Sequence, residues 1–142
     1  MIRKRLYVDI DGVVNHWPVD DKNNINIRPM ATEFLRWCDE HFNCCWLTAW
    51  KQSEADELSR SIYFKRSSTT MWRCVEWVIN KAESINFAGD VIWIDDDPTD
   101  HDIEVFNEES RNAPHRQYLL IKANPHNVDE LINIRMILEQ LI

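Results

Sequence analysis

The sequence has little glycine and no long apolar run. Its 142 residues include only two glycines, Gly12 and Gly89, so we expect each to mark a place where backbone freedom matters. No stretch approaches the roughly 18 consecutive apolar residues that a membrane span requires. The basic segment 1–5 passes too quickly into a strand-like run to be a signal peptide. We therefore predict a cytoplasmic protein that has no membrane span.

Positive charge is also scarce. The chain carries 16 Lys and Arg against 24 Asp and Glu, which gives a net charge of −8. Broad, sequence-independent binding of duplex nucleic acid needs a basic face, so we do not expect it here. A small phosphate ligand or a nucleic-acid strand end, held through a metal ion, stays compatible with this charge.

No Cys-x-x-Cys pair is present among the four cysteines. Most of them lie within apolar sequence, which favours buried, reduced thiols in a reducing compartment over a zinc site. A histidine close to one of them, His41 near Cys44, is only a weak zinc signal. The full set is Cys38, Cys44, Cys45 and Cys74.

What the sequence does contain is an apolar run that ends in two aspartates. In the stretch Leu6–Val13, Asp9 and Asp11 are spaced i, i+2 and are followed by Gly12. On an extended backbone residues two apart point the same way, so both carboxylates would enter one small volume. Such repulsion needs a cation or a shared proton, and Mg²⁺ is a natural partner. The alternative is a strand that simply runs into an acidic turn.

A second acidic cluster follows a second apolar run. Asp95, Asp96 and Asp97 come directly after Val91–Ile94. In open α/β sheets, sites lie outside the carboxyl ends of the strands. Two strands that each end in carboxylates therefore predict one shared metal site at one edge of a sheet.

Hydrophobic periodicity predicts one domain, 1–142, of alternating strands and helices. Such alternation is typical of an α/β fold in which a parallel sheet is covered by helices on both faces. Pro29 and Pro98 suit first helical turns, Ser53 is a candidate helix cap, and Asn127 is a candidate helix start. The predicted strands are 5–10, 43–48, 90–94 and 117–122, and the predicted helices are 29–41, 54–61, 71–84, 98–109 and 128–141.

Four of these pieces together resemble the haloacid dehalogenase superfamily of phosphohydrolases. Its first motif is matched by Tyr7-Val8-Asp9-Ile10-Asp11-Gly12-Val13 and its fourth by Val91-Ile92-Trp93-Ile94-Asp95-Asp96. The strand ending in Thr48 matches its second motif, and Lys81 matches, less specifically, the lysine of the third. The resemblance runs to about Pro98 and implies a Rossmann-like fold of that type.

The resemblance also implies roles. Asp9 would be the nucleophile that forms an aspartyl-phosphate, and Asp11 the general acid and then base. Asp96, Asp9 and the backbone carbonyl of Asp11 would bind Mg²⁺, with Asp95 as an indirect or alternative ligand. Thr48 with Ala49, and Lys81, would bind the phosphoryl group.

Several assignments stay open at this point. Lys65 rivals Lys81 for the lysine role, and Lys81 taken alone reads as a solvated helix residue. Asp97 and Asp100 are as likely to cap a helix as to bind metal. Finally, three residues after the acidic turn could face a leaving group, although a packed tryptophan is equally compatible: Asn15, His16 and Trp17.

The short segments between these motifs leave little room for the inserted cap domain that usually selects substrates in this family. A nearly capless protein suits a bulky phosphomonoester, such as a nucleotide or nucleic-acid end, and the tryptophan-rich stretch 46–50 looks similar to small nucleic-acid repair members. Trp17 and Trp50, if exposed, could stack a base. The alternative is a binding or regulatory module that keeps the fold without turnover.

Overall fold

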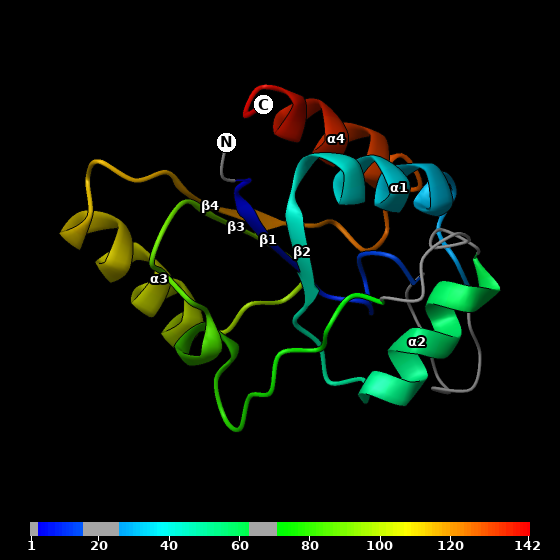
Figure 1. Ribbon diagram of the computed structural model, residues 1–142, viewed down its shortest axis with the longest axis horizontal. Helices are drawn as coiled ribbons and strands as arrows, with labels where there is room; N and C mark the ends of the chain where they lie inside the picture. The colour runs from blue at the N-terminus through cyan, green and yellow to red at the C-terminus, as the bar shows by residue number, and fades with distance from the viewer. Residues whose placement is uncertain (1–2, 16–25, 63–70) are drawn as a thin grey trace.

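The computed structural model describes residues 3–15, 26–62 and 71–142, and these form an α/β fold around one four-stranded parallel sheet (Figure 1). Eight of the nine predicted strands and helices are present, with ends shifted by a few residues. The strands are β1 (Arg5–Val8), β2 (Asn43–Trp46), β3 (Val91–Asp95) and β4 (Tyr118–Lys122). The helices are α1 (Ala31–His41), α2 (Gln52–Ser61), α3 (Asp100–Asn112) and α4 (Glu130–Glu139), with a 3₁₀ turn, η1 (Lys81–Ser84).

The strand order is β2-β1-β3-β4, so β1 lies between β2 and β3. Val8 at the end of β1 pairs with Trp46 of β2 and with Ile94 of β3. The chain first moves from β1 to β2 on one side and then returns to β3 on the other. The carboxyl ends of β1 and β3 therefore meet where the winding direction reverses, which is where open α/β sheets form their binding crevice.

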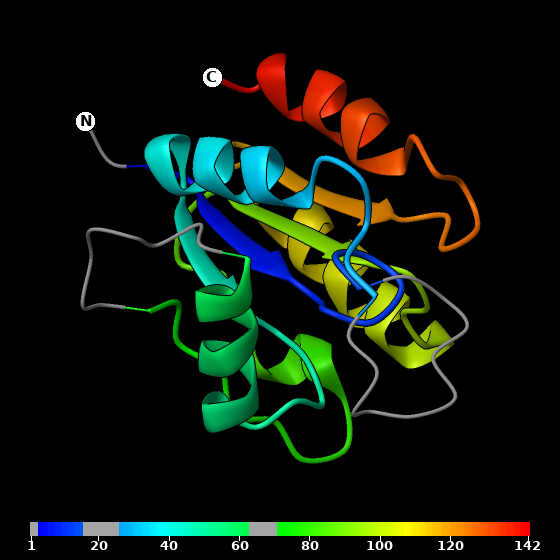
Figure 2. The ribbon, with the colours of Figure 1, turned by 90° about the vertical axis from the view of Figure 1, so that its right-hand side faces the viewer.

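Helices cover both faces of the sheet (Figure 2). Leu6 and Val8 of β1 point into one apolar cluster with α1, α2 and α4. Tyr7, between them, points into a second cluster with Phe106 of α3 and Ala82 of η1. The connection from β1 through α1 to β2 and the connection from β3 through α3 to β4 run in opposite directions across the sheet. They therefore keep the same hand by placing α1 and α3 on opposite faces.

The predicted helix over 71–84 is wrong. Residues 71–80 contain no helix; instead Cys74 forms a parallel bridge with Trp46, through hydrogen bonds of 2.9 Å from Trp46 N to Arg73 O and from Val75 N to Trp46 O. The expected core positions Val78 and Ile79 are 91% and 81% exposed. Pairing with β2 satisfies the backbone here, and tertiary contacts override the apolar spacing.

Two helix starts also differ from expectation. Helix α2 begins at Gln52 rather than 54, and the predicted cap Ser53 is wrong: the cap is Lys51, whose N–H donates to the Glu54 carboxylate at 2.9 Å. Helix α3 is capped by Thr99, whose hydroxyl accepts the Asp102 N–H at 3.1 Å.

Asn127 lies just ahead of α4, where its side chain accepts the Asp129 N–H at 3.1 Å. None of the four cysteines forms a disulfide, and Cys38 alone is buried; the other three are half-buried, contrary to the expected burial. Within the described part of the chain, no helix combines the length and apolar character that crossing a bilayer requires.

Candidate metal and phosphate site

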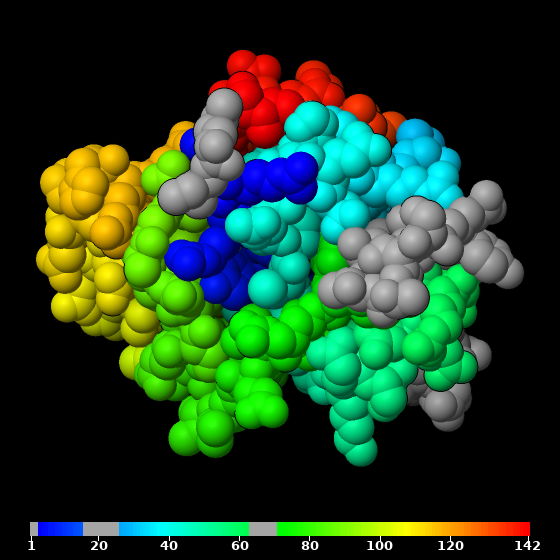
Figure 3. All heavy atoms as spheres, in the orientation of Figure 1, coloured from blue at the N-terminus to red at the C-terminus, as the bar shows by residue number. Residues whose placement is uncertain are grey.

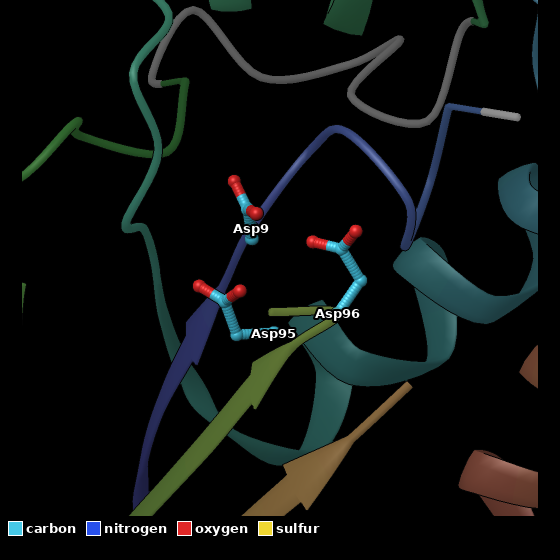
Figure 4. A group of neighbouring side chains, drawn as sticks. All are labelled: Asp9, Asp95 and Asp96. Atoms are coloured by element: carbon cyan, nitrogen blue, oxygen red, sulfur yellow. The ribbon is translucent and has the colours of Figure 1, made fainter. Parts of the chain in front are cut away.

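Two adjacent strands bring three carboxylates together. Asp9 follows β1 directly, Asp95 ends β3 and Asp96 follows it; the Asp9 N–H donates to Ile94 O at 3.0 Å and holds the two strand ends in line. One carboxylate oxygen from each aspartate lies within 4.8 Å of the others (Figure 4). Among the described residues, this is the one group of three or more acidic, histidine or cysteine side chains close enough to share a metal ion. The two acidic clusters therefore meet, as the sequence predicted.

Lys81 spans two of these carboxylates. Its Nζ lies 2.8 Å from Asp95 Oδ2 and 3.3 Å from Asp9 Oδ2. It starts the turn η1 rather than lying within a helix, and the turn is fixed because the Ala82 N–H donates to the buried Asp102 carboxylate at 3.0 Å. The structure thus brings Lys81 to the acidic group although its predicted local structure is wrong. Its rival Lys65 lies outside the described residues.

Burial and mutual repulsion set the protonation of this group. Burial, followed by the charge of Asp95, raises the pKa of Asp9 to about 8 despite the nearby Lys81. The same two causes raise the pKa of Asp96 to about 6. Burial alone would lower the pKa of Lys81, but Asp9 and Asp95 together raise it, so the ammonium is charged at neutral pH. One cation therefore faces three carboxylates, and two of those have a raised pKa.

The donor set fits a hard divalent cation. Carboxylate oxygens are what Mg²⁺ and similar ions prefer, and a second positive charge would relieve the repulsion that remains. Asp95 already uses both oxygens, since Oδ2 pairs with Lys81 and Oδ1 accepts the Asp97 N–H at 2.9 Å. Asp9 accepts the Ile10 N–H at 2.8 Å through Oδ1, and its Oδ2 lies 3.3 Å from Lys81 Nζ, farther from the ammonium than the Asp95 oxygen. Asp9 and Asp96 are thus the better direct ligands, with Asp95 holding Lys81.

Gly12 makes room for one of those ligands. Its φ is +76°, and a Cβ at this position would lie 2.3 Å from Asp96 Cγ and 2.3 Å from Oδ2. Any side chain here would push the Asp96 carboxylate away, in addition to straining the backbone. Gly12 therefore serves two purposes: it allows the turn that we expected, and it leaves the space that the Asp96 carboxylate occupies.

The Asp11 side chain lies apart from this carboxylate group. Its Oδ2 accepts the Trp50 Nε1–H at 2.9 Å, and its Oδ1 accepts from Asn15 Nδ2 at 3.3 Å. We expected an extended backbone to point the Asp9 and Asp11 side chains the same way. The strand β1 instead ends at Val8, and a tight turn begins at Ile10. As a metal ligand, Asp11 retains only the predicted use of its backbone carbonyl.

Thr48 lies at the same edge of the sheet, just beyond β2. The Leu47 N–H donates to Val8 O at 2.9 Å, so Thr48 stands one residue past the level of Asp9 on the neighbouring chain. It is buried, its hydroxyl accepts the Trp50 N–H at 3.3 Å, and Ala49 beside it is exposed. Among the described residues, neither Thr48 nor Ala49 forms a hydrogen bond with the three carboxylates, so their phosphate role stays a prediction.

The remaining candidates fall outside the acidic group. Asp97 and Asp100 are both exposed and belong neither to the carboxylate group nor to the Thr99 cap of α3. Asn15 is fully buried and links Asp11 to the Asn26 N–H at 2.7 Å, so the expectation that it faces a leaving group is wrong. His16 and Trp17 lie outside the described residues.

Sequence reasoning missed the aromatic supports of the site. Trp50 was expected to stack a base only if it were exposed, and it is instead 8% exposed and holds Asp11. Trp77 donates its Nε1–H to Thr48 O at 2.8 Å, and Lys81 Nζ lies 5.6 Å from its ring centroid. No spacing rule links these pairs; the one available signal was the closeness of Trp50 to Thr48 in the sequence.

Compared with models of known protein families and with curated proteins, the chain matches none. The resemblance to haloacid dehalogenase phosphohydrolases therefore rests on the motif residues themselves.

Proposed function

We propose that this protein is a Mg²⁺-dependent phosphohydrolase that cleaves phosphomonoesters through an aspartyl-phosphate on Asp9. The observation that carries the proposal is the convergence of Asp9, Asp95 and Asp96 at adjacent strand ends, with Lys81 across two of them. Structural ion pairs rarely crowd three carboxylates around one ammonium, because the excess charge is costly. When bound, the divalent cation would supply the charge that ionises these carboxylates and screens the phosphate dianion from them.

Asp9 is held in place for nucleophilic attack. Its Oδ1 is anchored by the Ile10 N–H and its Oδ2 lies beside Lys81. A carboxylate oxygen of Asp9 would attack phosphorus, and the bond from phosphorus to the leaving oxygen would break. Lys81 would then stabilise charge on the transferring group, and the Thr48 hydroxyl would donate to a phosphoryl oxygen.

Asp11 would manage the protons of both steps. Protonated Asp11 would give its proton to the leaving oxygen as the alcohol departs. The resulting carboxylate would then take a proton from water while the water oxygen attacks the aspartyl-phosphate. This second step breaks the bond between Asp9 and phosphorus, releases inorganic phosphate and restores both aspartates.

The test is release of phosphate from p-nitrophenyl phosphate with Mg²⁺ present and after chelation. Wild type should turn over only with the cation, and Asp9→Asn should lose at least about a thousandfold in kcat. Acid quenching of wild type should trap a chain heavier by one HPO₃ group, and Asp9→Asn should not trap it. The exposed Asp97→Asn is the matched control and should keep most activity.

Unchanged turnover by Asp9→Asn would exclude the proposed nucleophile. Absence of turnover by wild type, combined with Mg²⁺-dependent thermal stabilisation, would instead favour the binding or regulatory module.

A further inference from the structure

A hollow of about 1190 Å³ opens beyond the carboxyl end of β2, and Thr48 lines it whereas Asp9, Asp95 and Asp96 do not. Its walls come from the residues after β2, from Thr48 to Gln52, and from the extended segment 73–78. In Figure 3 it corresponds to the notch in the lower outline, between the green atoms of the 71–84 segment and the blue-green atoms at the start of α2. The hollow is larger than most small-ligand sites, so it has room for more than a small alkyl group.

The walls of the hollow touch the groups proposed to carry the chemistry. Trp50 lines it and hydrogen-bonds to Asp11, the proposed proton donor. Trp77 lines it, hydrogen-bonds to the Thr48 carbonyl and lies under Lys81. A group held in the hollow would therefore contact Trp50 and Trp77, and these two side chains in turn contact Asp11 and Lys81. This is where the leaving group of a phosphomonoester would lie.

Part of the wall is flat, apolar and fixed in advance. The indole N–H of Trp77 is already used by Thr48 O, so the ring does not need a polar partner from a ligand. Val75 and Val78 line the same hollow, and Val78 is 91% exposed at its rim. Rigid aromatic and aliphatic surface of this kind favours a planar, apolar group over a flexible polar one.

The Gln52 amide in the wall is already hydrogen-bonded to the protein through both its oxygen and its nitrogen. Gln52 Oε1 accepts the Cys74 N–H at 2.7 Å, and its Nε2 donates to Asp56 Oδ1 at 2.8 Å and to Trp72 O at 3.0 Å. Specific recognition of a bare sugar needs side chains free to pair with its hydroxyls, because unpaired hydroxyls lose affinity. Gln52 therefore offers little to a sugar, whereas the Trp77 ring offers a surface on which a planar group can stack.

The charge of the wall favours an anion. Lys51 and Arg73 line it against a single acid, Glu76, in a chain whose net charge is −8. Both cations are exposed, and neither has a salt bridge to a described residue. An exposed arginine beside aromatic surface is well suited to a phosphate that continues from a stacked base.

We propose that the hollow binds the nucleoside of a nucleotide that carries a second phosphate. The phosphomonoester would lie at Asp9, the base against Trp77 and Val78, and the second phosphate near Arg73 and Lys51. The cleavage of that monoester rests on the proposed function, whereas its binding does not. A nucleoside bisphosphate and the phosphorylated end of an oligonucleotide share this chemistry, and the experiment separates them.

The first measurement is binding without turnover, by calorimetry on Asp9→Asn protein with Mg²⁺. The ligands are ribose 5-phosphate, thymidine 5′-monophosphate, thymidine 3′,5′-bisphosphate and 5′-phosphorylated tetrathymidylate. The base should improve affinity over ribose 5-phosphate by about tenfold or more. The second phosphate should add about threefold to tenfold at low salt. An oligonucleotide source predicts that the tetramer binds more tightly than the bisphosphate; a free nucleotide predicts the reverse.

Two exposed neighbours provide a matched pair of variants. Val78→Asp places a negative charge on the wall and should weaken binding of the bisphosphate by about tenfold. Ile79→Asp makes the same charge change on an 81% exposed residue that does not line the hollow, and it should have a much smaller effect. Arg73→Gln should remove the gain from the second phosphate and leave ribose 5-phosphate binding unchanged. Val78, Ile79 and Arg73 are all exposed, so these changes should not unfold the protein.

The proposal is overturned if ribose 5-phosphate binds as tightly as the nucleotides, or if Val78→Asp and Ile79→Asp act alike. Hydrolysis by wild type, measured on the same four ligands and on p-nitrophenyl phosphate, separates failure of the nucleotide site from failure of the proposed function. Turnover of p-nitrophenyl phosphate without nucleotide preference sinks the nucleotide site alone. Nucleotide binding that obeys the variants, without any turnover, sinks the phosphohydrolase alone.

Discussion

The indole Nε1 of Trp50 lies 2.9 Å from Oδ2 of Asp11, so a residue that follows β2 holds a residue that follows β1. The other Asp11 oxygen accepts from buried Asn15. Two donors from different directions fix the plane of the carboxylate, which is what a group that must deliver a proton along one line requires. If Asp11 is the general acid, then Trp50 is its positioning residue.

Replacing Trp50 with Phe tests this relationship, because Phe keeps the ring and removes the N–H. An alkyl phosphate needs a proton on its leaving oxygen, whereas p-nitrophenolate leaves without one. We expect Trp50→Phe to lower kcat about tenfold or more for an alkyl phosphate and less than about threefold for p-nitrophenyl phosphate. The measurement is kcat for both substrates under saturating Mg²⁺.

The control for this prediction is a double variant. In an Asp11→Asn background, Trp50→Phe should cause no further loss on the alkyl phosphate, since the group that it positions is gone. Equal losses on both substrates would show instead that Trp50 acts through packing alone.

The approach of Gly12 to Asp96 supports a second prediction. Gly12→Ala would place a Cβ 2.3 Å from the Asp96 carboxylate, so Asp96 must move from its place beside Asp9. We expect a loss of about 1–2 kcal/mol in the free energy of unfolding from the backbone strain. We also expect the Mg²⁺-dependent rise in Tm to disappear, which thermal unfolding with and without Mg²⁺ would measure.

Gly89 supplies the matched control. Its φ is +157°, and the nearest atom to an added Cβ is Arg5 Nη1 at 3.6 Å, far from the acidic group. Gly89→Ala should therefore lower stability and keep the Mg²⁺ response. Retention of that response in Gly12→Ala would show that Asp96 is not a ligand.

How far the sequence predicts this molecule depends on whether local signals and tertiary contacts agree. They agree at Val91–Asp95, where a continuous apolar run is buried on both faces. The strand pairs with β1, so Asp95 at its end lies near Asp9. They disagree over 71–84, where apolar residues at helical spacing are rich in Trp, Cys, Val and Ile, which are weak helix formers. The pairing of Cys74 with Trp46 decides the outcome, and no local rule predicts such a pairing.

The candidate site divides in the same way. The meeting of Asp9 with Asp95 and Asp96 follows from parallel strands that end at one edge, so the pattern alone predicts it. The turn of Asp11 toward Trp50 was not predictable, since it depends on where β1 ends and on a side chain from the segment that follows β2. Lys81 reached the candidate nucleophile Asp9 through a different local structure, because chain order alone fixes which strands it lies between.

The raised pKa values predict an unusual pH dependence for the metal-free protein. Asp9 has a pKa of about 8 and Asp96 of about 6 in the folded state, against an ordinary value of 3.8. Between the ordinary and the raised values the folded chain binds more protons than the unfolded chain, so stability falls as pH rises. Urea unfolding in the presence of a chelator should therefore give a smaller free energy of unfolding at about pH 8 than at about pH 5.

Two changes should flatten that dependence. Saturating Mg²⁺ replaces the bound protons with a cation, and Asp9→Asn removes the more strongly shifted group while keeping an acceptor for the Ile10 N–H. Exposed Asp97→Asn, the control, should change the slope only slightly, because Asp97 is the weakest of the influences that raise the pKa of Asp96. A metal-free protein that gains stability steadily from about pH 5 to pH 8 would contradict the repulsion inferred at this site.

Lys81 gives a prediction in which two measured quantities move in opposite directions. Its ammonium lies 2.8 Å from Asp95 and 3.3 Å from Asp9, so it competes with a metal ion for the same negative charge. Lys81→Met keeps the apolar stem against Trp77 and removes the charge. We expect Mg²⁺ to bind several-fold more tightly, by calorimetry, while kcat on p-nitrophenyl phosphate falls about a hundredfold to a thousandfold. The metal-free variant should also be less stable, because two buried carboxylates lose their cation.

The matched control for Lys81 is Lys122→Met, which makes the same charge change on an exposed residue at the end of β4. It should leave Mg²⁺ affinity and kcat within about twofold of wild type, because exposed charges are screened. A Lys81→Met protein that binds Mg²⁺ no more tightly than wild type would place the ion away from Asp9 and Asp95. If such a protein also kept its turnover, Lys81 would be a structural counter-ion, and the charge on the transferring phosphoryl group would have to be stabilised from elsewhere.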